Sequence, residues 1–467
     1  MQTRKDLLQA HRLMTQRAAL ALVLGEPDDP ELPLRRLNVA AFCGVMVALL
    51  VMAVFGIYGL MNPGGATGLR QAGMLIVEKE TGARYVWCQN QLCPVDNYIS
   101  ARLLAGADSN HRKAVSRNSL TGFERGPLIG IPNLPNILPD ASQLVKTPWS
   151  VCVRMVDSPV SGRTSLVTLV VGHDVGGQRI GTDQAVVVKA NGQAWLIWNN
   201  HRLRVPADTV GSLTPDAATV AGKWLNALPE GPAYQAPYIP GRGATVAGPR
   251  GPAQVGRLFR ADSSSGTAWY VLMQDGLAPV SELEKDLLLA VPQANGGQPP
   301  QPVQLDPASV TGYRRSATTV SRPDLQGRPP SVVQHADTTP LCAVYDDPTG
   351  NSAGHLSVGG TLPTPPAGPA PTGVDKLDFP NGGAALVGLE TEPGKASTVS
   401  TYFLVTDQRR FALQSADVAA KLGYDVTTNA VVVPANVLGL LPVGPVLDPN
   451  AALNPIVIGP ASPQPSQ

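Results

Sequence analysis

The longest apolar run in the chain extends from Val39 to Met61 and predicts a membrane-spanning helix. No charged residue occurs between Leu37 and Leu69. The 23 residues of the run would extend about 34 Å as a helix, against a hydrocarbon core of about 30 Å. A secretory signal peptide fits less well, because the run is too long and no cleavage site with small residues follows it. We therefore expect a transmembrane helix at 37–61.

The charges beside this run predict its orientation. Arg35 and Arg36 lie directly before it and Arg12 and Arg17 precede them, whereas the first cation after it is Arg70. Lysine and arginine gather on the cytoplasmic side of membrane helices. The N-terminus is therefore expected in the cytoplasm and the C-terminal bulk outside.

Residues 4–24 predict an amphipathic helix before the membrane run. Burying its apolar side requires a partner, so the helix is expected to dock on the membrane surface or on a cytoplasmic protein. A short solvated helix without a partner is the alternative. The residues assigned to the cytoplasmic docking helix are Leu7, Met14, Arg17, Ala18 and Ala21.

Small residues recur at four-residue spacing within the membrane run. Such residues on one face let two membrane helices approach closely. Because Gly and Ala are frequent throughout the chain, the same pattern is equally compatible with no specific contact. The expected helix-packing face consists of Ala40, Gly44 and Ala48.

Beyond the membrane run, one pattern of apolar and polar positions occurs four times. An aromatic-rich strand enters a polar turn, a second short strand follows, and a helix-like segment comes next. A strand before each copy makes the unit three short strands and a helix. Because one such unit cannot bury its own apolar face, the copies are expected to pack on each other. The four turns are Gln89-Asn90-Gln91, Asn199-Asn200-His201, Gln274-Asp275-Gly276 and Thr406-Asp407-Gln408.

Four of the five cysteines follow the membrane run, and an even number outside the cytoplasm indicates two disulfides. Counting alone leaves three pairings open. If Asn90-Gln91 is a two-residue hairpin turn, Cys88 faces Cys93 at bridging distance, and Cys152 is left for Cys342. Free buried thiols are the alternative, and the spacing is poor for zinc. The entropic model credits the long loop with on the order of 5 kcal/mol as an upper estimate.

The four copies are not in tandem. A strand-rich region begins at Trp149, and residues 305–345 resemble its return. If Cys152 and Cys342 bond, these regions form one central domain with copies two and three inserted between its halves. The expected fold is α+β: a short cytoplasmic amphipathic helix, one transmembrane helix, and an elongated outer part of four small β-hairpin/helix repeat domains around a disulfide-closed central domain.

The expected boundaries follow from these features. The order is 1–36 for the cytoplasmic helix and linker, 37–61 for the transmembrane helix, 62–108 for repeat 1, 109–180 for the first part of the central domain, 181–250 for repeat 2, 251–300 for repeat 3, 301–380 for the second part of the central domain with a Pro-rich loop, 381–450 for repeat 4, and 451–467 for the C-terminal tail.

Composition excludes some function classes. A net charge of +1 gives no indication of a nucleic-acid partner, and Gly (47) with Pro (45) indicates many turns. A phosphate loop requires G-x-x-x-x-G-K-[ST], and the nearest approach, Gly388 to Gly394-Lys395-Ala396, is one residue too long and lacks the hydroxyl. This segment is therefore expected to be a surface turn.

The histidines do not form a ligand or catalytic pattern. His173-Asp174 and His335 with Asp337 could each be half of a triad, but no G-x-S-x-G motif supplies a nucleophile. Histidines in polar loops are the favoured reading. No catalytic, metal or cofactor site is expected, and no cofactor is assigned.

Several segments together resemble EccB, the single-span membrane component of the mycobacterial type VII (ESX) secretion system. They are Arg12–Asp28, Pro33–Arg36, Ile76–Val86, Ser100–Leu104 and Arg125–Pro132. The resemblance covers essentially the whole chain.

This resemblance implies an inner-membrane protein with a cytoplasmic N-terminus and a periplasmic bulk, in which Cys152 and Cys342 match the expected disulfide. It implies partners: an FtsK/SpoIIIE-type ATPase, a multi-span channel subunit, a further membrane subunit, a subtilisin-like membrane-anchored protease, membrane lipid, and further copies of the chain in a hexameric complex. Family members also carry an ATP-hydrolase attribution, which the missing phosphate loop does not support.

The expected function is that of a structural core subunit that anchors and shapes the periplasmic side of the secretion complex. One alternative is a module that binds peptidoglycan, with Trp87, Trp195 and Trp269 as an exposed platform. The other alternative is an ATP hydrolase that depends on Lys395.

Overall fold

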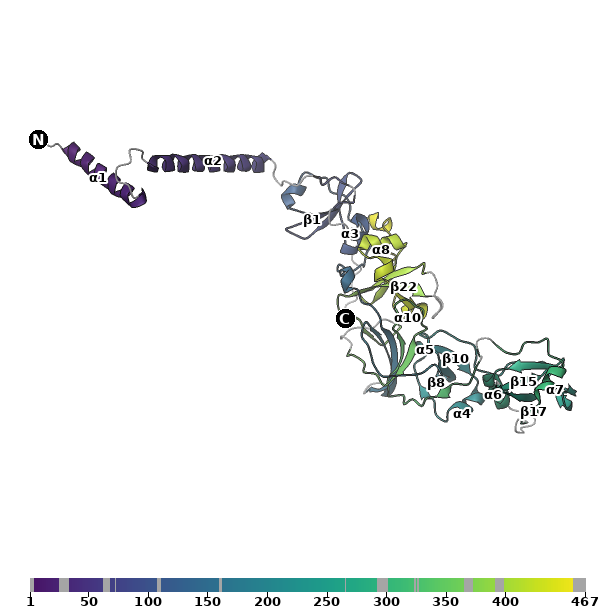
Figure 1. Ribbon diagram of the computed structural model, residues 1–467. Coiled ribbons are helices and arrows are strands. Elements are labelled where there is room, and N and C mark those ends of the chain that lie inside the picture. Colours follow the sequence, from purple (N-terminus) through teal and green to yellow (C-terminus); the bar gives the residue numbers. More distant parts are fainter. Residues whose placement is uncertain are drawn as a thin grey trace. The chain divides into compact units, whose positions relative to one another are not determined.

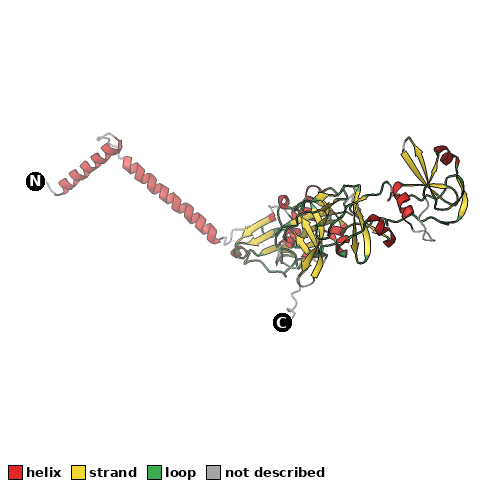
Figure 2. Cartoon of the chain, turned by 90° about the horizontal axis from the view of Figure 1, so that it is seen from below, coloured by secondary structure: helices red, strands yellow, loops and turns green. Residues whose placement is uncertain are grey.

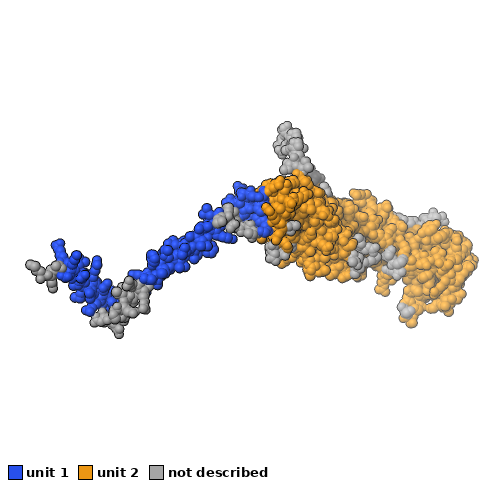
Figure 3. All heavy atoms as spheres, turned by 90° about the horizontal axis from the view of Figure 1, so that it is seen from above, with its two compact units in different colours: residues 1–69, 78–82, 114–123 blue, residues 70–77, 83–113, 124–467 orange. Residues whose placement is uncertain are grey.

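The computed structural model divides into two compact units, coloured in Figure 3, and each is described by itself. The first unit comprises residues 1–69, 78–82 and 114–123, and the second unit residues 70–77, 83–113 and 124–467. Gly25 and Pro27, the Gly394-Lys395-Ala396 segment and the tail beyond 456 lie outside the described residues. The structure describes residues 4–24, 33–61, 68–71, 73–106, 111–158, 162–264, 266–291, 301–322, 325, 327–364, 373–390 and 399–456.

The N-terminal part contains two long helices, α1 (Arg4–Leu24) and α2 (Pro33–Met61), both visible in Figure 1. α2 begins earlier than expected from the apolar run, because proline is well tolerated in the first helical turn, where its missing N–H has no partner to lose. Within α2, Leu37–Leu60 has a mean hydropathy of 2.6 and none of it is buried. By length and composition, this helix can cross a membrane.

Four sheets share one order of strands, drawn in yellow in Figure 2. The first and second strands of each sheet are antiparallel, the third strand pairs with the second, and a fourth lies beside the first. In three of these sheets the fourth strand is parallel to the first. A helix connects the third and fourth strands, as such a crossover requires.

The first sheet contains β1 (Leu75–Glu78), β2 (Arg84–Cys88), β3 (Gln91–Pro94) and β4 (Arg112–Val115), with helix α3 (Tyr98–Ala105). The second contains β8 (Gln184–Ala190), β9 (Gln193–Trp198), β10 (His201–Val205), β11 (Ala218–Thr219) and β18 (Ser331–Val332), with α4 (Ala207–Leu213) and α5 (Gly222–Leu225). The third contains β14 (Leu258–Ser263), β15 (Gly266–Leu272), β16 (Leu277–Val280) and β17 (Val303–Leu305), with α6 (Glu282–Ala290) and α7 (Pro307–Gly312). The fourth contains β22 (Ala384–Glu390), β23 (Tyr402–Thr406), β24 (Arg409–Ala412) and β25 (Val431–Pro434), with α8 (Ala416–Leu422), α9 (Val426–Asn429) and α10 (Ala435–Leu438). A separate hairpin consists of β12 (Thr245–Gly248) and β13 (Gly251–Gln254), and short 3₁₀ helices occupy Arg117–Leu120, Ala141–Gln143 and Ala451–Leu453.

Each of the four sheets thus has a fourth strand that the sequence did not predict. Below, each of these sheets with its helices is called a unit, from the first to the fourth. β4 lies beyond residue 108, and β17 lies beyond residue 300, where the first and third repeats were expected to end. These strands contain two to four residues. Such strands are too short to carry a period-two pattern of their own.

Local sequence signals set the ends of the helices. Asn97 caps α3 by accepting a hydrogen bond from the Ser100 N–H. Ser281 and Glu284 form a capping box at the start of α6. Gly423 ends α8 in the left-handed conformation at φ 96°, which glycine adopts without strain.

The hairpin turn of the first sheet lies one residue earlier than expected. Its central residues Gln89 and Asn90 both have positive φ, 43° and 64°, as in a type I′ turn. The register therefore pairs Cys88 with Gln91, and the prediction that Cys88 directly faces Cys93 is wrong. The two cysteines are diagonal neighbours on one face, with Cα atoms 6.0 Å apart, and a disulfide joins them.

The third strand of each unit is covered by a later segment that runs parallel to it. In the first unit, the Leu92 N–H donates to the Glu124 carbonyl at 2.8 Å, and the Leu92 carbonyl accepts from the Gly126 N–H at 3.2 Å. The same two bonds recur in the other units. Because they occupy the edge of the strand, this edge cannot pair with another chain. These covering segments comprise residues 124–126, 229–231, 314–316 and 442–444.

Glycine lets two of the covering segments approach closely. A Cβ on Gly126 would lie 2.5 Å from the Cys93 sulfur, and a Cβ on Gly444 would overlap the ring of Phe411. Both Cys93 and Phe411 directly follow the strand residue that makes the two hydrogen bonds. The glycines are therefore required by space and not by backbone conformation.

In the third unit, a different pair of residues allows the covering segment to approach the strand. Its covering segment has Ser316 where the others have glycine, and Ser316 donates to the carbonyl of Leu277 at 2.9 Å. The residue after Leu277 is the buried Ala278. A small strand residue thus leaves room for a side chain on the segment.

A six-stranded sheet holds the two halves of the central region together, in the order β21-β6-β5-β19-β20-β7. Cys152 on β5 lies directly opposite Cys342 on β19, with Cα atoms 4.0 Å apart, and a disulfide joins them. The second and third sheets are formed by the chain between β7 and β19. The strands are β5 (Trp149–Ser158), β6 (Gly162–Val171), β7 (Gln178–Arg179), β19 (Leu341–Tyr345), β20 (His355–Val358) and β21 (Lys376–Asp378).

The compact unit of residues 70–77, 83–113 and 124–467 is held together by shared apolar cores. The largest core joins one face of the central sheet, including Trp149, to Val186 of the second sheet and Val387 of the fourth. Within it, the Trp224 indole N–H donates to the Val151 carbonyl at 2.9 Å. Helix–helix contact between α3 and α8 forms another core, and Leu283 of α6 packs into the core of the second sheet.

A glycine series tests the role of the covering segments. Gly444→Ala is expected to destabilise the protein by about 1–3 kcal/mol, because the added methyl group overlaps the buried Phe411 ring. Gly231→Ala is expected to cost less, because its Cβ would lie 3.3 Å from the terminal methyl of Leu203. Thermal unfolding measures both variants. Gly211→Ala, where no atom lies within 4 Å, is the control, and equal melting temperatures for all three variants would contradict the packing argument.

Candidate interaction surfaces

The membrane helix presents its small residues on an exposed face. Ala40, Gly44 and Ala48 of α2 are all exposed, and a Cβ on Gly44 would meet no atom within 4 Å. The surface is therefore open to a second helix. The predicted packing face stays a prediction.

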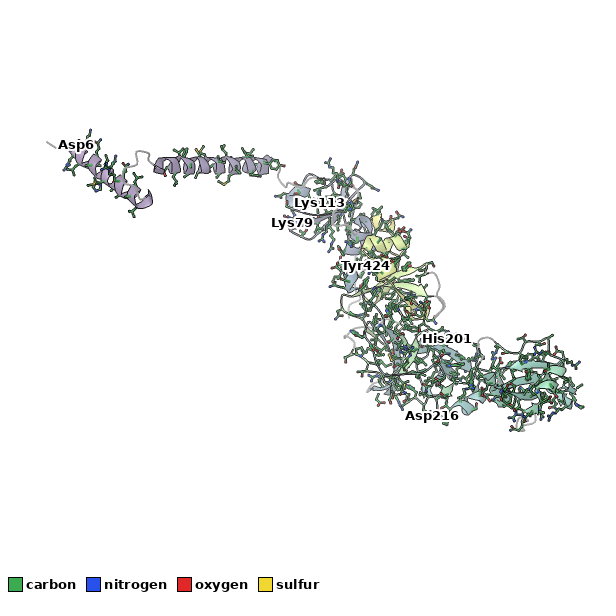
Figure 4. All side chains as sticks on the ribbon, viewed as in Figure 1. Asp6, Lys79, Lys113, His201, Asp216 and Tyr424 are labelled. Atoms are coloured by element: carbon green, nitrogen blue, oxygen red, sulfur yellow. A yellow bond between two sulfur atoms is a disulfide. The ribbon has the colours of Figure 1, made fainter. Side chains whose placement is uncertain are left out.

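Helix α1 exposes the residues assigned to docking. The side chains of Leu7 and Met14 are 66% and 73% exposed, and Arg17, Ala18 and Ala21 are exposed as well. Asp6, labelled in Figure 4, lies in the first turn, where the positive end of the helix dipole stabilises a carboxylate. Large apolar side chains in such numbers on one helix indicate a surface that another molecule or a lipid layer covers.

Each of the four units carries an aromatic ring with a cation over it. The ring lies three residues before the end of the second strand, at Tyr85, Trp195, Trp269 and Phe403. The distances from cation to ring centroid are between 4.5 and 5.9 Å. The pairs are Arg125–Tyr85, Arg202–Trp195, Lys285–Trp269 and Arg410–Phe403.

These pairs weaken the case for a wall-binding platform. Trp87, Trp195 and Trp269 are all partly buried. A stacked cation occupies one face of Trp195 and one face of Trp269. A sugar platform needs an open ring face. The faces of Trp195 and Trp269 that the cations cover cannot serve as such a platform.

The structure does not assemble a catalytic triad from the histidines considered. His173 pairs with Asp378 at 2.8 Å, and not with its neighbour Asp174. The Nε2 atom of His335 lies 2.8 Å from the Thr339 carbonyl. Among the described residues, no group of three or more His, Cys, Asp or Glu is arranged to hold a metal ion.

The segment nearest to a phosphate loop lies at the end of β22. Gly388 is part of this strand, and the Gly388 position is in contact with Val399 and Tyr402. Residues 391–398, which contain Lys395, lie outside the described residues. In β22, the backbone of Gly388 belongs to a sheet ladder and is not arranged as a phosphate-binding turn.

A contact that the sequence did not reveal joins the first and fourth units. Arg102 of α3 donates to the Leu422 carbonyl at the end of α8, at 2.9 Å. A cation at this position complements the negative end of the helix dipole. Tyr424, labelled in Figure 4, donates to the Pro139 carbonyl at 2.7 Å. The two contacts join residues that are 320 and 285 positions apart in the sequence, so no local sequence motif predicts them.

These observations define a class of protein: a chain of mixed helix and strand structure in which the described residues include one candidate membrane span and two disulfides. Residues 1–456 match the family described as type VII secretion system ESX-1, transport TM domain B. The chain belongs to this family, and the resemblance to EccB is confirmed.

Curated relatives extend over nearly the full chain. One is the ESX-1 secretion system ATPase EccB1 of Mycolicibacterium smegmatis (strain MKD8), which is 30% identical over 99% of this chain and 97% of its own length. Another is the ESX-3 secretion system ATPase EccB3 of Mycolicibacterium smegmatis (strain ATCC 700084 / mc(2)155), which is 28% identical over 95% of this chain and 88% of its own length.

Solved structures share the fold. The EccB3 dimer from the ESX-3 core complex is 25% identical, with a TM-score of 0.60, over 82% of this chain and 100% of that chain. A chain of an intact ESX-5 inner membrane complex is 24% identical, with a TM-score of 0.62, over 100% of this chain and 98% of that chain. The overall architecture is therefore that of EccB subunits.

The partial burial of His335 predicts a pH dependence of stability. Burial lowers the pKa of His335, against smaller opposing effects of the Thr339 carbonyl and Asp337. The unfolded chain therefore binds the proton more readily, so stability is full above the usual pKa of about 6.5 and falls as the pH drops below it. Denaturant unfolding at several pH values should show this loss reduced in His335→Gln.

A matched control accompanies this test. His173→Gln removes a ring that is 57% exposed, and it is the control for the loss of an imidazole elsewhere in the chain. A native-like loss of stability in His335→Gln would contradict the assignment to His335.

Proposed function

We propose that this chain is a structural core subunit of a type VII (ESX) secretion complex in the inner membrane. The family match over residues 1–456 carries the proposal. The exposed apolar span within α2 and the likeness to EccB chains in ESX complexes support it. On this proposal the subunit anchors the complex and shapes its periplasmic side.

The proposed orientation places α1 in the cytoplasm and the sheets in the periplasm. The arginines before α2 support it through the positive-inside rule. The disulfides support it independently, because two bonds in one chain favour an oxidising compartment. An inverted topology would leave both disulfides in a reducing cytoplasm.

We further propose that the four similar sheets are copies of one repeat unit around the central sheet. The shared strand order, the recurrent covering segments and the recurrent cation–aromatic pairs support this. The proposed boundaries follow those of the sequence, with β4 added to the first unit and β17 to the third. Their exposed faces are the proposed contacts between copies of the chain.

The proposed partners are those of the family. They are an FtsK/SpoIIIE-type ATPase, a multi-span channel subunit, a further membrane subunit, a subtilisin-like membrane-anchored protease and other copies of this chain in a hexameric complex. Relatives are solved as a dimer from an ESX-3 core complex and within an ESX-5 inner membrane complex. For this chain, α1 is the proposed cytoplasmic docking element and α2 the proposed membrane contact.

Deletion of residues 1–24 tests the docking role of α1. The variant should still insert into the membrane through α2. Co-purification of the other core components should fall about tenfold or more, because the apolar side of α1 is lost. A tenfold loss of binding corresponds to about 1.4 kcal/mol. Native gels and pull-down measure the complex.

Point variants make this test specific. Leu7→Ser with Met14→Ser removes exposed apolar contacts and should reproduce the defect. Gln9→Ser with Gln16→Ser changes the polar side of the same helix and should not. Assembly at native levels after the deletion would contradict the docking proposal.

ATP hydrolysis is the second candidate function, because curated relatives are named as ATPases. The imperfect motif before Lys395 is the one place in the sequence that approaches a phosphate loop. We expect the purified chain to show no ATP turnover above background and Lys395→Ala to change nothing. Steady turnover that is lost in Lys395→Ala would establish the enzyme and contradict the structural proposal.

A further inference from the structure

A pocket of about 360 Å³ lies at one edge of the central sheet. Strands β19, β20 and β7 form its floor. The register places Val344 opposite His355 and Arg179 opposite Ser357. These side chains therefore share one face of the sheet. The volume falls at the small end of the range for ligand sites.

Charged groups of both signs converge on this pocket. Asp346 and Asp174 supply two carboxylates, and Arg179 supplies a guanidinium. His355 also lines the pocket, and its side chain is only 15% exposed. Its Nδ1 atom is buried without a hydrogen-bond partner, because the nearest carboxylate oxygen, on Asp346, is 3.6 Å away. A buried polar atom without a partner costs free energy, so this arrangement is incomplete as it stands.

The ionisation of the pocket follows from these neighbours. Burial lowers the pKa of His355 and Arg179 lowers it further, while Asp346 and Asp174 act in the opposite direction. The ring is therefore neutral near pH 7. The pocket then holds two negative charges and one positive charge around a neutral imidazole.

We infer that the edge pocket binds a small zwitterion, such as a free amino acid or a short peptide with both ends unblocked. The ammonium group meets the carboxylates of Asp346 and Asp174, and the carboxylate group meets Arg179. The two carboxylates disfavour phosphates and other multiply charged anions. Arg179 disfavours a simple amine without a balancing negative charge.

Other readings of this pocket are weaker. A metal ion is disfavoured, because the described residues hold no suitable group of three ligands. A purely structural ion pair does not explain the 3.6 Å gap between His355 and Asp346. The inference does not rest on the secretion role, and either can fail without the other.

Calorimetric titration of the full chain in detergent tests the inference. Glycylglycine should bind saturably with a Kd of about 1 mM, a weak affinity expected for so small a ligand. Glycylglycine amide lacks the carboxylate and N-acetylglycylglycine lacks the ammonium group. Both should bind at least tenfold more weakly. Free glycine distinguishes an amino-acid site from a peptide site by its relative affinity.

Variants locate the binding. Arg179→Gln and Asp346→Asn should each weaken glycylglycine binding about tenfold or more, which corresponds to about 1.4 kcal/mol. Arg163→Gln and Asp157→Asn change charges on the same sheet outside the pocket and should bind like the native chain. Unchanged affinity in the Arg179→Gln/Asp346→Asn double variant overturns the inference. Equal binding of the two blocked peptides by the native chain also overturns it, and this comparison does not depend on any variant folding.

Discussion

The pairing of β5 with β19 is the constraint on which the central sheet and the sheets packed on it depend. These strands are adjacent in the central sheet although Cys152 and Cys342 are 190 residues apart in sequence. The cost of closing a loop rises only slowly with its length, so two complete units can be inserted at modest cost. The disulfide lowers that cost further by restricting the unfolded chain. Because the main core also includes residues of the second and fourth sheets, separation of β5 from β19 would remove the support of both.

A second constraint acts within each unit. A sheet of four short strands has two faces and two edges, and it is too small to bury them alone. The third strand is covered by the chain's own later segment, and one face of the second sheet and one face of the fourth are covered in the core that they share with the central sheet. In the first and fourth units the space for this is so limited that glycine is needed beside Cys93 and Phe411. The covering segments therefore prevent the edge pairing between chains to which small sheets are prone.

The sequence predicted what depends on local pattern and missed what depends on distant contacts. The span and the four hairpins rest on neighbouring residues, and the structure contains each. The turn at Gln89-Asn90 was misplaced by one residue, because several polar residues in a row leave the centre of a turn undetermined. The parallel fourth strands were missed because two to four residues carry no period.

The surfaces show the same division. Exposure of Leu7 and Met14 followed from the helical pattern alone. The edge pocket did not, because Arg179 and His355 come together only through strand pairing across 176 residues of sequence and two inserted units. The contact of Arg102 with the end of α8 likewise requires the packing of two helices that lie far apart in the sequence. The spacing of residues along the sequence does not predict such long-range contacts.

The cation–aromatic pairs indicate which feature of the unit matters physically. The ring stays at one position of the second strand, but the cation comes from different elements: the third strand supplies Arg202 and Arg410, the covering segment supplies Arg125, and helix α6 supplies Lys285. Each pair contributes about 0.5–1 kcal/mol at a partly exposed site. Because the donor moves while the contact remains, covering the ring is the common requirement, and the identity of the covering element is not. The covering contacts thus differ from unit to unit, as Ser316 next to the strand residues Leu277 and Ala278 also illustrates, so one unit's covering segment would not reproduce the contacts of another.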